Sequence, residues 1–196
     1  MTVRVVPLTG EAMTRALPEL ARLRIEVFRA WPYLYDGTLD YEEQYLEKFS
    51  RADQAVIVAA FDGADVVGVA TAAPLSGQNE EIKAPFVDAG FDIAKIFYFG
   101  ESVLKPSYRG RGLGHAFFDH REAHARSFGK YTDSAFCGVV RESCHPLRPT
   151  DYMPLDAFWQ KRGYEKVEGL LAWFSWQDID QTDETEKPMQ FWMRKL

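Results

Sequence analysis

The chain has 196 residues, of which 46% are hydrophobic and 27% charged, and its formal net charge at pH 7 is −6. We expect one domain over residues 1–196, because a chain of this length buries about 70% of its unfolded surface and needs no disulfide or metal to hold its core. The negative charge argues against a general nucleic-acid binder, since such proteins are usually basic. It is compatible with a cationic amine substrate, although a solubilising surface would give the same charge.

Cysteine usage and hydropathy bear on the compartment. Cys137 and Cys144 are the only cysteines, and their spacing is not one that binds zinc. Residues 1–7 lack the long apolar core of a signal peptide, and no apolar run is long enough to span a membrane. We therefore expect a cytoplasmic protein with reduced thiols, no metal site and no membrane attachment.

In the first half of the chain, the spacing of apolar residues predicts a strand, two helices and then two strands joined by a turn at Asp62-Gly63. Residues 77–90 are polar and predict an irregular segment with room for one helical turn. The five regular elements are expected over residues 3–8, 11–28, 41–49, 55–61 and 66–73.

The second half of the chain alternates strands and helices around a glycine-rich loop. A long loop with Pro146 and Pro149 precedes the last helix, and an acidic loop over residues 178–186 joins the last two strands. Strands are expected over residues 96–104, 130–140, 167–176 and 190–196, and helices over residues 113–128 and 154–162.

The glycine-rich loop is the most informative segment. Gly110, Gly112 and Gly114 stand at alternate positions, so the backbone can turn tightly and approach a ligand closely. The loop opens a helix, whose first amides lack internal partners and carry partial positive charge. Arg109 and Arg111 add full positive charges. Together these features predict a site for a diphosphate or another anion.

Two common phosphate loops do not match this segment. A Walker loop ends in Gly-Lys-Ser/Thr, whereas Gly114 is followed by His115, and the same histidine breaks a G-x-G-x-x-G pattern that starts at Gly110. The pattern that fits is Arg-x-x-Gly-x-Gly, formed by Arg109, Gly112 and Gly114. It resembles the acetyl-CoA loop of the GNAT superfamily of N-acetyltransferases.

This resemblance covers essentially the whole chain. The predicted order of strands and helices is that of the GNAT fold, and residues 158–164, Phe-Trp-Gln-Lys-Arg-Gly-Tyr, are similar to the family's Phe-Tyr-x-Lys-x-Gly-Phe ending. The resemblance implies an α/β fold with a mixed, mostly antiparallel central sheet and helices on both faces. It also implies transfer of an acetyl group from acetyl-CoA to a primary amine by direct attack in a ternary complex.

The resemblance also implies site residues. In the family, the loop amides bind the cofactor diphosphate and the preceding strand pairs with the pantetheine arm. Trp159 stands where many members have a tyrosine that protonates the departing thiolate, and an indole cannot supply a proton as a phenol can. Tyr152 stands where many members have an asparagine near the cofactor. The expected acetyl-CoA-binding residues are Val103, Leu104, Arg109, Gly110, Arg111, Gly112, Leu113 and Gly114.

Glu101 is the candidate catalytic base. It is a carboxylate in an otherwise apolar strand, where partial desolvation could raise its pKa and suit it to accept a proton. Related enzymes often use a glutamate on this strand or a water that it holds. Because side chains alternate along a strand, Glu101 could face the wrong side unless Gly100 marks a bulge. The alternative interpretation is an ion pair with an arginine at the sheet rim.

The acceptor side is expected to be aromatic. Trp31, Tyr33 and Tyr35 follow the first helix, a region that lines the acceptor pocket in the family, and aromatic rings can hold a cation or an apolar chain. His145, in the long loop, is a candidate substrate contact or second base. The alternative for the three aromatic residues is a packing role, and the alternative for His145 is a position in a solvated loop. The acceptor is expected to be a small-molecule or peptide amine, and a homodimer remains open.

Two other functions remain open at this stage. One is a non-catalytic acyl-CoA-binding sensor on the same fold, which the replacement of the family tyrosine by Trp159 favours. The other is a nucleotide-dependent enzyme that uses the glycine loop for a different phosphate.

Overall fold

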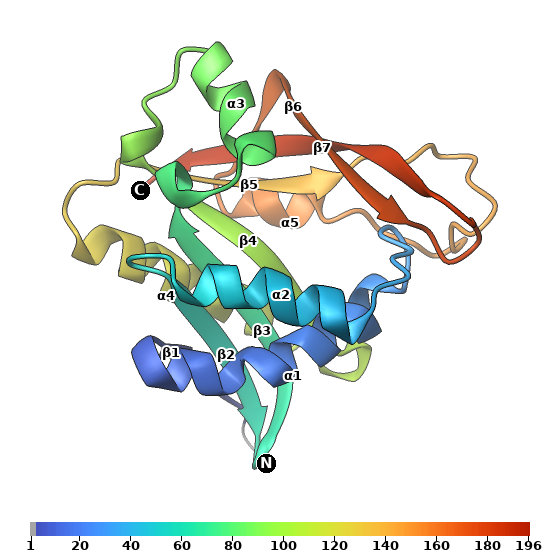
Figure 1. Ribbon diagram of the computed structural model, residues 1–196, viewed down its shortest axis with the longest axis horizontal. Helices are drawn as coiled ribbons and strands as arrows, with labels where there is room; N and C mark the ends of the chain where they lie inside the picture. Colours follow the sequence, from blue (N-terminus) through green and yellow to red (C-terminus); the bar gives the residue numbers. More distant parts are fainter. Residues whose placement is uncertain (1–2) are drawn as a thin grey trace.

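The computed structural model describes residues 3–196, which form one seven-stranded sheet with helices on both faces (Figure 1). The strands are β1 (Arg4–Leu8), β2 (Val56–Asp62), β3 (Asp65–Pro74), β4 (Ile96–Leu104), β5 (Asp133–Val139), β6 (Glu165–Gln177) and β7 (Glu184–Lys195). The helices are α1 (Gly10–Phe28), α2 (Leu39–Ser50), α3 (Glu80–Asp88), α4 (Leu113–Ser127) and α5 (Asp156–Lys161).

The sheet has the strand order β1-β2-β3-β4-β5-β7-β6. Only β4 and β5 run parallel, and every other neighbouring pair is antiparallel. Helices α1 and α2 cover one face, and α4 and α5 cover the other (Figure 1). The predicted mixed, mostly antiparallel sheet between helices is therefore confirmed. None of the helices in residues 3–196 is long and apolar enough to cross a membrane.

The parallel strands β4 and β5 stay together for only three residue pairs, the last of which is Tyr98 with Ala135. Beyond that pair β4 continues alongside β3, and β5 continues alongside β7, so the two strands separate (Figure 1). We call the resulting gap between Tyr98–Leu104 and Ala135–Val139 the wedge. Its facing strand edges have no neighbouring strand among the described residues, which leaves backbone donors and acceptors for a ligand.

A bulge in β4 decides which way its side chains point. Ala70 pairs with Ser102 whereas Ala72 pairs with Phe99, so two residues of β4 face a single residue of β3. In a regular strand Phe99 and Glu101 would share a face. Here the Phe99 ring packs toward α4, whereas the Glu101 carboxylate faces α1. The bulge that the sequence analysis required for Glu101 is therefore present.

Gly100 makes this bulge possible. A side chain at this position would place its Cβ 2.5 Å from Thr71 Oγ1, which is closer than any real contact. The same hydroxyl oxygen accepts a hydrogen bond from the Glu101 backbone N–H at 3.2 Å. The bulge thus depends on a glycine on β4 and a threonine on β3.

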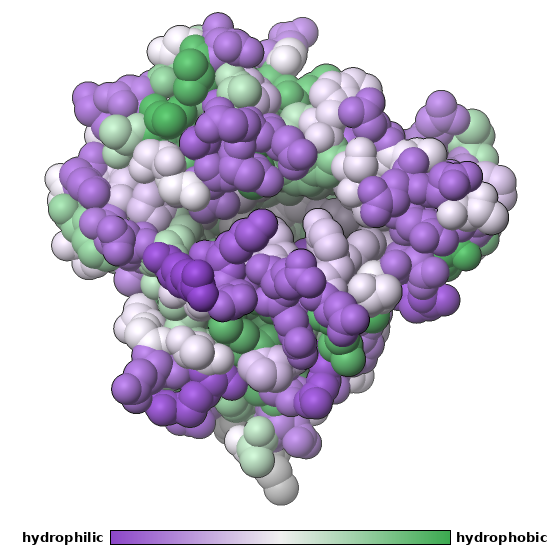
Figure 2. Space-filling model, viewed as in Figure 1, coloured by the Kyte–Doolittle hydropathy of each residue, from purple (hydrophilic) through white to green (hydrophobic). Residues whose placement is uncertain are grey.

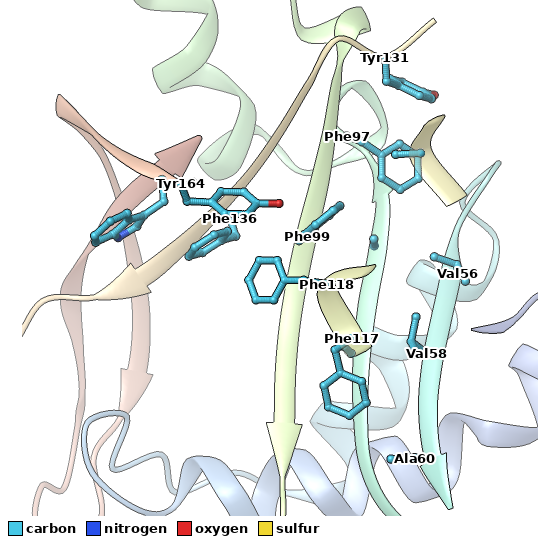
Figure 3. Close-up of a cluster of buried hydrophobic side chains, with 14 of the residues drawn as sticks. Val56, Val58, Ala60, Phe97, Phe99, Phe117, Phe118, Tyr131, Phe136 and Tyr164 are labelled. Atoms are coloured by element: carbon cyan, nitrogen blue, oxygen red, sulfur yellow. The ribbon is translucent and has the colours of Figure 1, made fainter. Parts of the chain in front are cut away.

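Aromatic rings fill the α4 side of the wedge (Figure 3). The ring centroids of Phe99 and Phe118 are 5.9 Å apart, those of Phe118 and Phe136 are 5.7 Å apart, and those of Phe136 and Tyr164 are 5.0 Å apart. On the other face, the surface is hollowed between α2 and the β5–β7 part of the sheet (Figure 2). The wedge therefore has an aromatic floor and opens on the side of α1 and α2.

Two elements are longer than the sequence predicted. Residues 77–90 contain the nine-residue helix α3 rather than a single turn. Asn79 caps it by accepting a hydrogen bond from the Ile82 N–H, and Glu80 and Glu81 occupy its first turn, which is a helix-start signal present in the sequence. Strand β7 begins at residue 184 rather than 190, because it pairs with β6 along a long hairpin that shortens the acidic loop.

A buried carboxylate joins three elements behind the sheet. Glu122 on α4 accepts hydrogen bonds from Arg162 at 2.9 Å and from Arg194 at 3.1 Å, and the Tyr164 hydroxyl donates to it at 3.3 Å. Its side chain is only 4% exposed. Glu122 therefore links α4 to the end of α5 and to β7.

Replacing Glu122 by alanine should lower the free energy of unfolding by about 3–5 kcal/mol, because it removes the buried carboxylate on which Arg162, Arg194 and Tyr164 converge. Urea denaturation measures this loss. Asp119→Ala is the matched control: Asp119 also pairs with Arg162 but its side chain is 66% exposed, so the loss should stay below about 1 kcal/mol. Equal losses in the two variants would contradict this interpretation of Glu122.

Candidate active site

The glycine loop lies at the open end of the wedge, between β4 and α4. Gly110 and Gly112 have φ angles of +74° and +80°, a left-handed conformation that glycine adopts without strain. A Cβ at either position would meet no atom within 4 Å, so the backbone there is open to approach. Gly112 is the N-cap of α4, and none of the described side chains caps this helix start. Arg111 lies beside the loop, where it donates to the Ser107 carbonyl at 2.9 Å.

Gly114 has a different role from the other two glycines. A Cβ there would lie 3.3 Å from the Phe158 ring, which packs α5 against the first turn of α4. The ring of His115 also lies on Phe158, with centroids 4.8 Å apart. Close helix packing therefore explains this glycine, and a contact of its amide with a ligand stays a prediction.

The two strand residues predicted to bind the cofactor keep their side chains within the protein. Val103 is fully buried against α1, and Leu104 is half-buried beside Gly68. A ligand in the wedge would therefore meet these residues only through their backbone. Arg109 is exposed at the start of the loop.

Glu101 belongs to a buried charge network between α1, α2 and β4. Its Oε2 pairs with Arg24 Nη1 at 2.9 Å, and Arg24 Nε donates to Glu42. The Glu101 side chain is 5% exposed and that of Glu42 is fully buried. The Oε1 atoms of both carboxylates are buried without a hydrogen-bond partner among the described residues. An arginine pair at Glu101 is thus present, but in the interior rather than at the sheet rim.

The network sets the protonation of its neighbours. Burial opposes the charge of Arg24, but Glu101, Tyr45 and Glu42 outweigh it, so the pKa of Arg24 is raised. Glu101 and then burial raise the pKa of Tyr45, whose ring lies 4.6 Å from the Arg24 guanidinium. Tyr45 therefore stays a neutral phenol beside the two carboxylates.

A second buried arginine lies behind the bulge. Arg121 on α4 is 1% exposed, donates to the Thr71 carbonyl at 3.3 Å, and lies over the rings of Phe99 and Phe118 at 4.5 and 4.8 Å. Burial lowers its pKa to about 10, so it stays charged at neutral pH. Its positive charge acts on Glu101 from the opposite side of the sheet.

Arg24 and Glu42 are not among the site residues predicted from the sequence, although the sequence contains a signal for them. Arg24 follows the buried Leu20 by four residues, and Glu42 precedes the buried Leu46 by four. Residues four apart share a helix face. A charged residue on the apolar face of an amphipathic helix indicates a buried ion pair or a functional group.

The aromatic loop between α1 and α2 is held by a clamp around Arg141. This side chain binds both carboxylate oxygens of Asp178, at 2.6 and 2.9 Å, and donates to the carbonyls of Pro32 and Tyr33. Lys187 Nζ lies 3.3 Å from the same carboxylate. The clamp joins three segments that lie far apart in the sequence, and no local motif predicts it.

Tyr33 and Tyr35 are half-buried in this region. The Tyr33 ring packs against Phe28 at 4.5 Å and Trp176 at 6.1 Å, and the Trp176 indole donates to the Tyr33 carbonyl at 3.0 Å. Burial and the proximity of Glu42 raise the pKa of Tyr35. These two tyrosines therefore approach the charge network from the loop.

Trp31 and His145, each predicted from the sequence as an acceptor contact, lie next to each other. Their ring centroids are 5.0 Å apart, and Tyr152 meets Trp31 edge-on at 5.9 Å. The indole N–H of Trp31 is buried without a hydrogen-bond partner among residues 3–196. A donor of this kind is available to a ligand.

Trp159 lies on the opposite side of β5. Its indole packs against Phe136 and Trp192 with centroids 5.0 and 5.1 Å away, and a Cβ at Gly138 would lie 3.0 Å from it. Its contacts are those of a core residue. This packing supports the sequence interpretation that Trp159 supplies no proton.

Comparison with known proteins identifies the class. A family model described as "Acetyltransferase (GNAT) family" matches residues 19–142, and the chain belongs to this family. GNAT acetyltransferases use acetyl-CoA as the acetyl donor, so acetyl transfer and the acetyl-CoA co-substrate are confirmed. No curated protein sequence matches the chain.

Solved structures share the fold at low sequence identity. Arabidopsis thaliana NAA60 in complex with a bisubstrate analogue gives a TM-score of 0.63 at 12% identity, over 99% of this chain and 98% of that one. Ribosomal-protein-alanine N-acetyltransferase from Brucella melitensis gives 0.60 at 15%, over 100% of both chains. PaiA N-acetyltransferase from Thermoplasma acidophilum in complex with coenzyme A gives 0.58 at 14%, over 100% of both chains.

The residues around the wedge fit acetyl-CoA. Gly110 and Gly112 leave an open cradle at the start of α4, where helix amides and arginines favour a diphosphate. The unpaired edge of β4 offers backbone groups to an amide-containing arm. The geometry of the loop and of the β4 edge thus supports the cofactor-binding residues predicted from the sequence. The contact of each individual residue with the cofactor stays a prediction.

Gly112→Glu should weaken acetyl-CoA binding by at least about tenfold, because it adds a bulky anion where the diphosphate is expected. Isothermal titration calorimetry measures the dissociation constant. Gly90→Glu is the matched control, because Gly90 has a φ of +79° and open space around it but lies at the end of α3. A folded Gly112→Glu protein with wild-type affinity would contradict the loop assignment.

Asp178 should make stability depend on pH. Burial opposes its charge, but Arg141 and Lys187 outweigh burial and hold the pKa of Asp178 below its usual value. Its stabilisation is therefore present above the unfolded pKa of about 3.9 and is lost as the pH falls through the lower folded pKa. Asp178→Asn should cost about 3–5 kcal/mol at pH 7 and less below pH 4, by urea denaturation. Exposed Asp180→Asn is the control; a pH-independent cost for Asp178→Asn would disprove this account.

Proposed function

We propose that this acetyltransferase moves the acetyl group of acetyl-CoA to a primary amine by direct attack in a ternary complex. The observation that carries the proposal is the Oε1 of Glu101 at the β4 bulge, beside the wedge, which is buried and has no hydrogen-bond partner among residues 3–196. Buried polar atoms normally have partners, and an orphan atom in a site is available to a ligand. A primary amine brings the N–H donors that this oxygen lacks.

Glu101 is the proposed proton acceptor. An alkyl amine has a pKa of about 10.4 and enters mostly as an ammonium ion, so it must lose a proton before it can attack. In the proposed reaction the ammonium gives one proton to Glu101, and the neutral amine then forms a C–N bond to the acetyl carbon. The C–S bond breaks to release the thiolate, and the second proton of the nitrogen passes to that thiolate, which leaves as the CoA thiol. Arg24 holds the other oxygen of Glu101 and so fixes the direction of its carboxylate.

The cysteines support direct attack over an acyl-enzyme route. Burial raises the pKa of the Cys137 thiol to about 12, and its sulfur lies 3.1 Å from the Tyr98 hydroxyl. A cysteine nucleophile needs a thiolate, and this environment disfavours one. Cys144 is exposed in the long loop.

The remaining chemistry needs no dedicated acid. A thiol pKa near about 8.5 makes thiolate a tolerable leaving group, so the core role of Trp159 is compatible with turnover. Backbone N–H groups on the open edge of β4 would polarise the acetyl carbonyl. Acetyl-CoA supplies the activated thioester, and the chain binds it, orients it and accepts the proton.

The acceptor is proposed to enter from the hollowed face in Figure 2. Its proposed contacts are Trp31, Tyr33, Tyr35 and His145. These side chains would hold a small-molecule or peptide amine through ring contacts and a free indole N–H. The cytoplasmic location stays a prediction from the sequence.

A non-catalytic acyl-CoA sensor is the second candidate, and the packing of Trp159 favours it, because the family's proton donor is absent there. A panel of primary amines with detection of the released CoA thiol separates the two. Release of CoA with any amine supports the enzyme. Tight acetyl-CoA binding without release across the panel supports the sensor.

Glu101→Gln should lower turnover at pH 7 by about 10²–10⁴, the range of general-base catalysis, and the deficit should shrink at high pH where more amine is neutral. Steady-state rates between pH 6 and 10 measure both effects. Acetyl-CoA affinity should change little, because the loop is untouched.

Glu42→Gln is the matched control, because Glu42 is the other buried partner of Arg24. It should destabilise the protein as Glu101→Gln does, without producing a deficit that recovers with pH. A folded Glu101→Gln enzyme with near-normal turnover at neutral pH would remove Glu101 from the mechanism.

A further inference from the structure

Two side chains close the narrow end of the wedge. Tyr98 belongs to the last residue pair between β4 and β5, opposite Ala135. Cys137 follows Ala135 by two residues on β5, so it lies on the same face. The Tyr98 hydroxyl and the Cys137 sulfur are 3.1 Å apart and connect the two strands just where their backbone pairing ends.

The groups at this end of the wedge are neutral. Burial raises the pKa of Tyr98 well above its usual value and that of Cys137 to about 12. Burial raises the pKa of the Tyr33 phenol above its usual value, and the nearby Cys137 thiol adds to this shift. Phenols and a thiol therefore form the lining, which suits a small uncharged group.

The direction of the cofactor follows from the topology. The glycine loop follows β4 after a short helical turn at Pro106–Tyr108, at the wide end of the wedge, and Tyr98 lies six residues before the end of β4, roughly 20 Å away from it along an extended strand. A diphosphate on the loop and an arm along β4 leave the thioester pointing toward the narrow end. The acyl chain beyond the carbonyl then faces Tyr98 and Cys137.

We infer that Tyr98 and Cys137 form the end wall of the acyl site and restrict the donor to acetyl-CoA over longer acyl-CoA thioesters. The inference rests on the proposed function, since it takes the acetyl thioester to lie in the wedge. The wall fixes the acyl length because a well-packed interior has no room for an extra methylene. A single methylene that does not fit changes discrimination by about 10–200-fold.

Binding of acetyl-, propionyl- and butyryl-CoA without any acceptor tests the wall, by isothermal titration calorimetry. The wild-type dissociation constant should rise at least about tenfold from acetyl- to propionyl-CoA, and further for butyryl-CoA. Cys137→Ala removes a sulfur about the size of a methylene, so it should reduce the acetyl-to-propionyl difference by about tenfold.

Two further variants are the controls for Cys137→Ala. Cys137→Ser keeps an atom at the sulfur position and should retain the wild-type preference. Cys144→Ala makes the same substitution at the exposed cysteine and should change nothing. Thermal denaturation verifies that each variant is folded.

Either of two results would overturn the inference: equal wild-type affinity for acetyl- and butyryl-CoA, or wild-type discrimination retained in folded Cys137→Ala. Failure of the proposed function looks different. In that case the acyl-CoA preference and its loss in Cys137→Ala are observed, but no amine in the panel releases CoA.

Discussion

The bulge in β4 is the constraint on which the site depends. One extra residue, accommodated by Gly100 against Thr71, turns Glu101 from the α4 face of the sheet to the α1 face. The same strand loses its neighbour β5 after Tyr98. A carboxylate, an open backbone edge and a glycine loop therefore follow one another along a single rigid strand. A site built on a central strand is more precise than one carried by loops.

The buried charges around β4 lie on both faces of the sheet and not in a single cluster. Glu101 and Glu42 share Arg24 on one face, and Arg121 lies behind the bulge on the other. Two carboxylates and two guanidinium groups thus offset one another through the sheet. Buried ions are expensive unless their hydrogen bonds are complete, and one oxygen of each carboxylate lacks a partner in the described part of the chain. An unsatisfied buried atom of this kind needs an explanation, and a catalytic role is one.

The acceptor side is made rigid by a different interaction, the ion pair of Arg141 with Asp178. Arg141 binds Asp178 and the carbonyl of Tyr33. These hydrogen bonds tie the α1–α2 loop to the β6–β7 hairpin. Fixing this loop sets the position of the Tyr33 ring that it carries. A loop held in this way loses little conformational entropy when a ligand binds.

The sequence by itself determined the features that local chemistry controls. Glycines at alternate positions before a helix indicate an anion loop wherever they occur, and apolar periodicity predicted most elements, including β4 within its observed bounds. A carboxylate in an apolar strand identified Glu101 as a candidate, and the bulge it required is present.

Only the tertiary structure decided the partners of these residues. Tyr98 meets Cys137 across 39 residues of chain, and Arg141 meets Asp178 across 37, so no local pattern relates them. Helix periodicity indicates that Arg24 and Glu42 lie on apolar faces, but only the packing of the helices on the sheet decides that they pair with each other and with Glu101. Periodicity reports which residues are buried, whereas the contacts among buried groups are set by how the elements pack. The charge network, the clamp and the end wall of the wedge therefore appear only in the folded chain.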